Sequence, residues 1–269
     1  MSHRRHGSGV RVELREAAGY AVLWMGSEPV NSMTLELWSA LSDALTELET
    51  SPQIRGVILA SELKKHIFTA GNDIKELYAK TTSQERYTAF WRTQTIFLCR
   101  LLRSPLATVC AIRGACPAGG CAVALCCDYR VQSDTGTFGL NEVQLGIPVP
   151  KYWAKLFSLV SGRTAGDLTL QLGTLLNPQE AKSMGLLHEV VPGAAVMPAA
   201  ERAMTSMFLT LPDEARGATK VNMRGEFSAE WEAYAEEEAV SGWAMLSTPA
   251  VMATLGGVIA RLSKGKAKL

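Results

Sequence analysis

Two periodicities of apolar positions alternate through the first half of the chain. Residues 10–14 and 20–24 alternate apolar and polar side chains around Ala17-Ala18-Gly19, which predicts a hairpin of two strands. Between residues 34 and 49 the apolar positions recur every three or four residues, which predicts an amphipathic helix that ends before Pro52. Further strands are expected at 56–60, 67–69 and 107–112 and near 131 and 138, and further helices at 73–79, 83–102 and 119–127.

The second half of the chain has mostly helical periodicity. Helices are expected at 152–160, 164–172, 178–184, 196–209, 213–226, 229–245 and 249–262, with one strand-like segment at 188–191. A β/α pattern followed by helices predicts an α/β core and a helical C-terminal part. We therefore divide the chain into a flexible N-terminal segment (1–9), a core domain (10–200) and a helical C-terminal region (201–269).

Composition and charge narrow the class of protein. The 269 residues carry 27 Lys and Arg against 26 Asp and Glu, and a net charge of +1 argues against a general nucleic-acid binder. The candidate membrane span, 115–127, is uncharged for only 13 residues, too short to cross a bilayer, and contains proline and glycine, so no membrane partner is expected. The six cysteines form no CxxC pair and only four histidines are present, so we expect a reduced intracellular protein without a metal site.

Two glycine-bearing junctions, 68–73 (FTAGND) and 114–120 (GACPAGG), each join a strand-like run to a helix-like run. Backbone N–H groups at such junctions lack intrahelical partners, and two that converge can stabilise an oxyanion. Taken alone, each junction is more simply explained as a tight turn without a ligand. The signatures GxGxxG, GxxxxGK[ST], HExxH and GxSxG are absent, which argues against dinucleotide enzymes, NTPases, zincins and typical serine hydrolases.

A single acidic residue, Glu142, lies in the apolar and glycine-flanked segment 139–148 (GLNEVQLGIP). A carboxylate that is desolvated in such a segment can act as a general base. The alternative is a surface glutamate at a helix start, which is the commoner situation for a lone glutamate.

Together and in this order, FTAGNDIKEL, IRGACPAGGCAVALCCDYRV and GLNEVQLGIPVP resemble the crotonase (enoyl-CoA hydratase/isomerase) superfamily, and within it the mitochondrial-type Δ3,Δ2-enoyl-CoA isomerases. The resemblance extends from Tyr20 to about Leu211 and includes PVNSMTLELW. It implies an α/β fold with a crotonase-like core of ββα repeats wound into a spiral, a helical C-terminal trimerisation region, and a homotrimer or a dimer of trimers. The apolar tail residues that we expect to need a partner surface are Trp231, Tyr234, Trp243, Met245 and Leu255.

The resemblance also implies catalytic roles. The N–H groups of Ala70 and Gly119 match the oxyanion hole and would hold the thioester carbonyl of an acyl-CoA. Hydratases of the superfamily carry two catalytic glutamates, whose positions here are Ala122 and Glu142. With one glutamate, the implied activity is Δ3,Δ2-enoyl-CoA isomerisation in the β-oxidation of unsaturated fatty acids, with Glu142 carrying a proton from C2 to C4. Hydration of 2-enoyl-CoA, or a non-catalytic homologue that binds acyl-CoA or RNA, remains the alternative.

The same segments supply the expected substrate contacts. Gly71, Asn72, Asp73 and Ile74 match the segment beside the CoA thioester and adenine, although Asp73 could equally cap the following helix. Asn141 is expected to orient Glu142 or to contact the substrate. The acyl pocket is expected to involve Leu140, Ile147, Pro148, Val149 and Trp153, each of which could instead be a core residue.

Three further expectations complete the picture. No cofactor is expected, because coenzyme A would arrive as part of the substrate. Lys64, Lys65 and Lys264 could meet the CoA phosphates, although a solvated surface is the commoner place for lysine, and Cys121 is expected to be a buried, inert thiol. The location is expected to be an organelle: the family resemblance implies the mitochondrial matrix, whereas the last three residues, AKL, resemble a peroxisomal signal.

Overall fold

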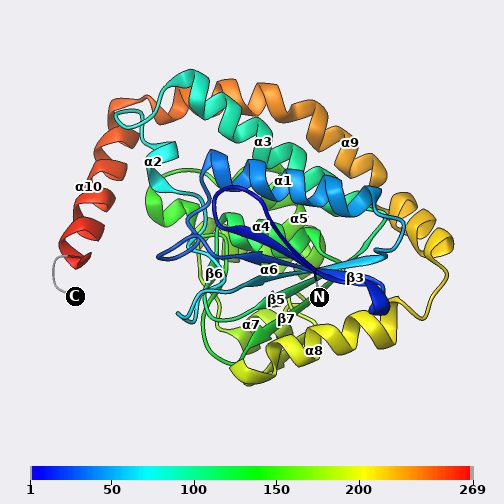
Figure 1. Ribbon diagram of the computed structural model, residues 1–269. Helices are drawn as coiled ribbons and strands as arrows, with labels where there is room; N and C mark the ends of the chain where they lie inside the picture. The colour runs from blue at the N-terminus through cyan, green and yellow to red at the C-terminus, as the bar shows by residue number, and fades with distance from the viewer. Residues whose placement is uncertain (1, 267–269) are drawn as a thin grey trace.

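A seven-stranded sheet runs through the centre of the computed structural model, which describes residues 2–266, with side chains for 3–261 (Figure 1). Its strand order is β1-β2-β3-β4-β5-β7-β9; the first three strands are antiparallel and the others are parallel. The strands are β1 (Ser2–Arg5), β2 (Val10–Arg15), β3 (Tyr20–Met25), β4 (Gly56–Ser61), β5 (Ala107–Ile112), β7 (Tyr129–Ser133) and β9 (Glu189–Val191). A second sheet pairs β6 (Cys116–Pro117) with β8 (Phe138–Gly139) in parallel.

Helices cover both faces of the large sheet (Figure 1). The α-helices are α1 (Leu35–Thr50), α2 (Ile74–Leu77), α3 (Gln84–Arg103), α4 (Gly119–Cys126), α5 (Lys151–Ser161), α6 (Arg163–Leu172), α7 (Pro178–Ser183), α8 (Val196–Ala203), α9 (Asp213–Leu246) and α10 (Pro249–Lys266). In Figure 1, α1 and α3 lie above the sheet and α8 lies below it. Each residue of β4 and β5 is buried, as expected of parallel strands whose two faces both lie under helices.

The apolar side chains form two cores, one on each face of the sheet. The larger core joins the sheet to α1 and α3 and includes Trp38 and Phe97, whose ring centroids are 5.6 Å apart. The smaller core joins Ile58 and Val109 of the sheet to Ala200 of α8 and to Met204 in the π-turn that follows it. The central strands are therefore fixed on both sides, so the loops that follow them start from rigid positions.

The long helix α9 packs along α3 and reaches the far end of the molecule, where α10 turns down beside α2 (Figure 1). Its first half is tied to the sheet by the half-buried carboxylate of Asp128, which directly precedes β7. Lys220 Nζ lies 2.6 Å from Asp128 Oδ2, and Arg224 Nη1 lies 2.8 Å from Asp128 Oδ1. These ion pairs fix the start of α9, so its last turns and α10 are held over the loops at the end of the sheet.

The N-terminal segment differs from the sequence expectation of a flexible stretch at 1–9. Ser2–Arg5 form β1, which pairs antiparallel with β2, with Arg4 opposite Val12. The reason is the open edge of the β2–β3 hairpin, whose unpaired backbone groups accept one more strand. Only the turn between β1 and β2 separates this segment from the predicted core domain.

Two predicted elements have different forms in the structure. Residues 67–69 do not form a strand; only an isolated bridge joins Ile67 to Ala115. The reason is that the Asn31 side chain hydrogen-bonds the backbone of this segment, with Nδ2 donating to Phe68 O over 2.9 Å. The two helices predicted at 213–226 and 229–245 are one helix, α9. Ser228, which lies in the predicted gap, donates a hydrogen bond to Cys99 O of α3 and leaves the helix unbroken.

The predicted helical tail is also more self-contained than expected. The predicted boundary at residue 200 falls inside α8, whose Ala199 and Ala200 both pack under the sheet. Trp231 and Leu255 are both fully buried within the chain, so the expectation that they need a partner surface is wrong. Within residues 2–266 no single helix is long and apolar enough to cross a membrane; only α9 and α10 together pass by length and composition, with an 80° bend between them.

Candidate functional site

A cavity of about 780 Å³ opens where the loops after β3, β4 and β5 meet the C-terminal helices. One part of its lining is loop backbone and polar side chains, and the other part is apolar and comes from helices α3, α5, α9 and α10. Among the predicted site residues, the lining includes Ala70, Asn72, Asp73, Ile74, Asn141, Glu142, Ile147, Pro148 and Trp153. Gly71, Gly119 and Leu140 are not part of the lining; Leu140 is fully buried in the main core.

The N–H group of Ala70 is already used inside the protein. It donates to Val30 O at 2.9 Å, while the next residue, Gly71, donates to Thr69 Oγ1 at 3.0 Å. An N–H group that is paired in this way cannot also bind an oxyanion without losing its bond. The assignment of Ala70 as an oxyanion donor is therefore wrong, although Ala70 itself lines the cavity.

The side chain of Asn72 is held in this turn by two hydrogen bonds. Its Oδ1 accepts a hydrogen bond from Trp38 Nε1 at 3.2 Å, and its Nδ2 donates to Gln94 Oε1 at 2.9 Å. Its neighbours along the chain are also fixed, since Met33 N donates to the Gly71 carbonyl and Asp73 N donates to the Met33 carbonyl. Among the described residues, no acceptor pairs with the N–H of Asn72 itself.

The junction before α4 presents a second N–H group close to Asn72. No acceptor among the described residues pairs with the N–H of Gly119. A Cβ on Gly119 would lie 2.9 Å from Asn72 Oδ1, so the two junctions touch and only glycine fits there. Ala118 has a φ of 50°, which a non-glycine residue rarely adopts, and strain of this kind is typical of functional turns. The structure thus brings Asn72 and Gly119 together as the unpaired N–H groups of the two glycine-bearing junctions.

Glu142 is the buried carboxylate of the cavity. It begins the 3₁₀ turn Glu142–Leu145 (η2) and is only 5% exposed. Its Oε2 has no hydrogen-bond partner among the described residues. Burial raises the pKa of Glu142 to about 7, and a hydrogen bond from its own backbone N–H opposes this shift. A carboxyl group with such a pKa can both take and return a proton near neutral pH.

Short elements position the residues around Glu142 and the turn at 70–74. Asn141 precedes the η2 turn and lines the cavity. Asp73 Oδ1 accepts from Lys75 N at 2.9 Å, so Asp73 does cap α2 as the alternative interpretation had it. The short helix α2 is in turn held by Glu76, whose carboxylate accepts from Leu35 N and from the Arg86 guanidinium.

Most of the apolar wall comes from residues that the sequence motifs do not include. Tyr87 and Trp91, one turn apart on α3, stack at 5.7 Å, and Trp91 stacks on Trp153 of α5 at 6.2 Å. All three line the cavity. The wall is completed by Leu77, Leu145, Pro150, Met245, Leu246, Val258 and Ile259. The spacing of Tyr87 and Trp91 at i and i+4 was a usable signal that two aromatic rings share one face of this helix.

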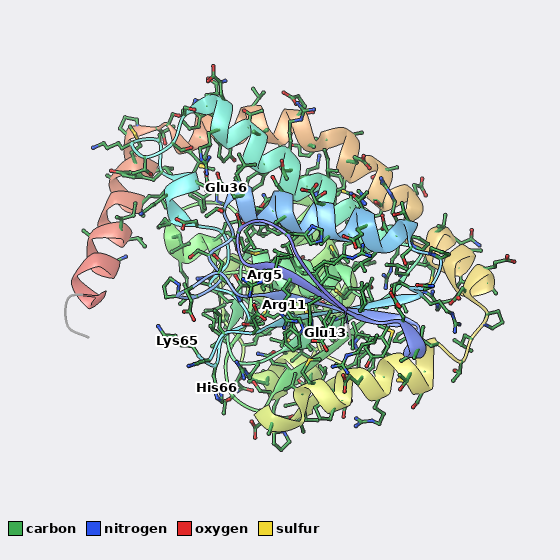
Figure 2. All side chains as sticks on the ribbon, in the orientation of Figure 1. Arg5, Arg11, Glu13, Glu36, Lys65 and His66 are labelled. Atoms are coloured by element: carbon green, nitrogen blue, oxygen red, sulfur yellow. The ribbon has the colours of Figure 1, made fainter. Side chains whose placement is uncertain are left out.

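Other candidates lie outside this cavity. Lys65 and His66 project at the edge of the molecule (Figure 2), and Lys64 lines a separate hollow of about 440 Å³. Lys264 lies outside the residues with described side chains. Cys121 is fully buried, which confirms the expectation of a buried thiol, and burial raises the pKa of this thiol well above its ordinary value. In the described part of the chain, no three His, Cys, Asp or Glu side chains are grouped to hold a metal ion.

Comparisons with known proteins give this site a context. Residues 16–245 match the family described as enoyl-CoA hydratase/isomerase. The chain is 42% identical over 217 residues to enoyl-CoA delta isomerase 1, mitochondrial, of Mus musculus, covering 80% of this chain and 74% of the mouse protein. It is 41% identical over 224 residues to the Homo sapiens protein of the same name, covering 82% and 73%.

Solved structures agree with these sequence relationships. The crystal structure of human mitochondrial Δ3-Δ2-enoyl-CoA isomerase matches with a TM-score of 0.92 at 36% identity, covering 96% of this chain and 99% of the human chain. An enoyl-CoA hydratase from Bacillus halodurans shares the fold, with a TM-score of 0.84 at 21% identity over 93% of this chain and all of the bacterial chain. The predicted crotonase-like α/β fold is confirmed, and the chain belongs to the enoyl-CoA hydratase/isomerase family.

Proposed function

We propose that the protein is a Δ3,Δ2-enoyl-CoA isomerase that moves the double bond of a 3-enoyl-CoA to give the 2-trans-enoyl-CoA. The observation that carries this proposal is the lone buried carboxylate of Glu142 in the lining of the cavity. The other lining carboxylates are Glu28, which is exposed, and Asp73, which caps α2. Relatives at 41–42% identity bear the name enoyl-CoA delta isomerase, which supports the same activity.

The chemistry needs one group that accepts and returns a proton. The C2 protons of a 3-enoyl-CoA are acidic because the resulting anion is delocalised over the thioester and the adjacent double bond. Glu142 removes a C2 proton, and the electrons form a dienolate with its charge on the thioester oxygen. The protonated Glu142 then delivers the proton to C4, which leaves the double bond between C2 and C3 and regenerates the carboxylate. One carboxylate is therefore enough for the cycle.

The developing oxyanion needs donors that are ready before the reaction. The N–H groups of Asn72 and Gly119 are the pair that the hydrogen bonding leaves free, so we assign the oxyanion hole to them. The bonds from Trp38 and to Gln94 hold the Asn72 side chain, which keeps the peptide group in place. Loss of one such donor typically lowers the rate about 10²- to 10³-fold.

The substrate supplies coenzyme A and no cofactor is needed in this mechanism. Hydration of 2-enoyl-CoA is the competing reaction of the family, and it uses a second carboxylate at the position of Ala122. That position is an alanine, 1% exposed, on α4. A water molecule would then have only Glu142 to orient and deprotonate it, which disfavours hydration.

The test is an assay of the purified protein with trans-3-hexenoyl-CoA. We expect 2-trans-hexenoyl-CoA to form and little 3-hydroxyhexanoyl-CoA to follow. A protein that only hydrates 2-enoyl-CoA would be a hydratase, and one that binds acyl-CoA without turnover would be a non-catalytic homologue. Either result would overturn the proposal.

Assembly and location follow as secondary proposals. We infer a homotrimer, alone or as a dimer of trimers, that assembles through the face of α5 and α6, because Leu159, Leu168 and Leu172 are 59–70% exposed there. The relatives are named as mitochondrial proteins, and this favours the mitochondrial matrix over the peroxisome. The AKL tripeptide, on which the peroxisomal alternative depends, lies outside the described residues.

A further inference from the structure

One buried carboxylate outside the reaction centre stands behind the apolar wall of the cavity. Glu238 of α9 is 9% exposed and has partners on two other helices. Its Oε2 accepts from Trp91 Nε1 of α3 at 3.1 Å, and its Oε1 accepts from the backbone N–H of Lys151, the first residue of α5, at 3.0 Å. One carboxylate thus joins three helices at the apolar end of the cavity.

One partner of Glu238, Trp91, belongs to the cavity wall, and the other, Lys151, lies in the chain between the lining residues Pro150 and Trp153. Trp91 lines the cavity and stacks on Trp153, which is two residues after Lys151 on α5. The first turn of α5 has no side-chain cap of its own, since Pro150 precedes it, so the carboxylate of Glu238 serves that helix end from another helix. The position of the Trp91–Trp153 stack therefore depends on Glu238.

The apolar wall is where the acyl chain must lie. The thioester is placed by the N–H groups and by Glu142 at the polar part of the cavity. The hydrocarbon beyond C4 then extends towards the apolar lining, because that is the part of the cavity that accommodates a chain without polar groups. The Trp91–Trp153 stack occupies part of this lining as two large, rigid rings, and rigid rings set a sharp limit on the room for the chain.

We propose that Glu238 is a positioning residue that sets acyl chain-length selectivity, by holding the Trp91 indole and the start of α5 so that the Trp91–Trp153 stack limits the depth of the acyl pocket. Glu238 touches neither substrate nor the reacting atoms. The inference rests on the proposed function only in placing the acyl group of an acyl-CoA in this cavity, and it does not depend on turnover.

The test measures binding of saturated hexanoyl-, decanoyl- and tetradecanoyl-CoA by calorimetry. The readout is the ratio of the Kd for tetradecanoyl-CoA to the Kd for hexanoyl-CoA. In Glu238→Gln an amide replaces the two acceptor oxygens, so only one of the two N–H donors keeps a partner. We expect the ratio to fall about tenfold, since the fit of a few methylenes in a pocket is worth this much or more. Trp91→Phe, which removes the Nε1–H donor and shrinks the ring, should lower the ratio in the same direction.

A matched control and a second assay separate the possible failures. Glu237→Gln changes the exposed carboxylate next in sequence on α9 and should leave the ratio within about twofold of wild type. Turnover of trans-3-hexenoyl-CoA should stay within about threefold of wild type in Glu238→Gln, because the reacting atoms are untouched. If Glu238→Gln fails to fold by its melting curve, Trp91→Phe decides.

An unchanged ratio in the folded variants, or a ratio that rises, would overturn the role of Glu238. Inactivity of the wild-type protein towards 3-enoyl-CoA would overturn the proposed function alone, because the binding ratio is measured without turnover. The absence of acyl-CoA binding by the wild-type protein would overturn both.

Discussion

The backbone N–H of Ala70 donates to the carbonyl of Val30 over 2.9 Å, and for this reason we propose Asn72, not Ala70, as the oxyanion donor. The two residues are only two positions apart and both line the cavity, so the sequence pattern alone could not separate them. The separation is physical: a donor that already has an acceptor gains little from a second one, whereas the Asn72 N–H has no acceptor among the described residues.

This assignment predicts different results from removing each N–H. Replacing the amide N–H of residue 72 by an ester oxygen, with a hydroxy acid that keeps the side chain, should lower kcat about 10²- to 10³-fold. The same replacement at residue 70 should lower stability slightly, by about 1 kcal/mol, and leave kcat nearly unchanged. The opposite order of effects on kcat would return the role to Ala70.

Gly119 can be tested by an ordinary substitution. In Gly119→Ala the new Cβ would lie 2.9 Å from Asn72 Oδ1, so the two junctions must move apart. We expect kcat to fall about 10²-fold or more because the donor pair no longer matches the oxyanion. Gly257→Ala on α10 adds a methyl group with no atom within 4 Å and is the matched control. Equal activity of the two variants would argue against the oxyanion hole at Gly119.

The pKa of Glu142 predicts the pH dependence of the reaction. A general base acts only when it is deprotonated, and burial raises the pKa of this carboxyl to about 7. The value of kcat/KM should therefore be constant above this pH and fall about tenfold for each pH unit below it. A profile that stays flat down to pH 5 would contradict the assignment.

The raised pKa of Glu142 also predicts how the stability of the protein depends on pH. The dependence has the opposite sign from that of a carboxylate in a salt bridge, whose pKa is lowered by folding. The carboxyl of Glu142 is ionised above pH 4.5 in the unfolded chain but only above about 7 in the folded protein. Stability is thus lost as the pH rises between these values, by about 3 kcal/mol if the whole shift is realised. Glu142→Gln cannot ionise, so its gain in free energy of unfolding over wild type should be larger at pH 8 than at pH 4. Equal differences in urea melts at both pH values would refute the buried charge.

Leu168 provides the test of assembly. It is 62% exposed on α6, and Leu168→Glu should convert the assembly to monomers in sedimentation at micromolar concentration. Met223, 72% exposed on α9, gives the control Met223→Glu, which should leave the assembly intact. A monomeric wild-type protein would remove the inference of a trimer altogether.

Periodicity predicted the elements whose burial depends on one apolar face. The helix at α1 and the strands β4 and β5 lie where the pattern placed them, within a residue or two. The segment at 67–69 was wrong because a distant side chain, that of Asn31, bonds its backbone. The local pattern of apolar and polar residues cannot predict a contact between residues that are so far apart in the sequence.

The site was predictable to the extent that its residues are adjacent in sequence. Glu142, Asn72 and Asp73 come from motifs and do line the cavity. Trp91 and Glu238 are 147 residues apart in the chain and meet only through the packing of α9 on α3. The apolar end of the cavity could therefore be identified only from the structure, not from the sequence.

The transfer of a labelled hydrogen within the substrate tests the central claim most directly. The carboxyl of Glu142 is buried, so a deuteron taken from C2 should exchange with water more slowly than it is delivered. With 3-hexenoyl-CoA deuterated at C2, we predict that a substantial fraction of the product carries deuterium at C4, and that Glu142→Gln forms product about 10²- to 10⁴-fold more slowly. Product made by Glu142→Gln at the wild-type rate, with its C4 hydrogen drawn from solvent alone, would contradict a proton shuttle by this glutamate.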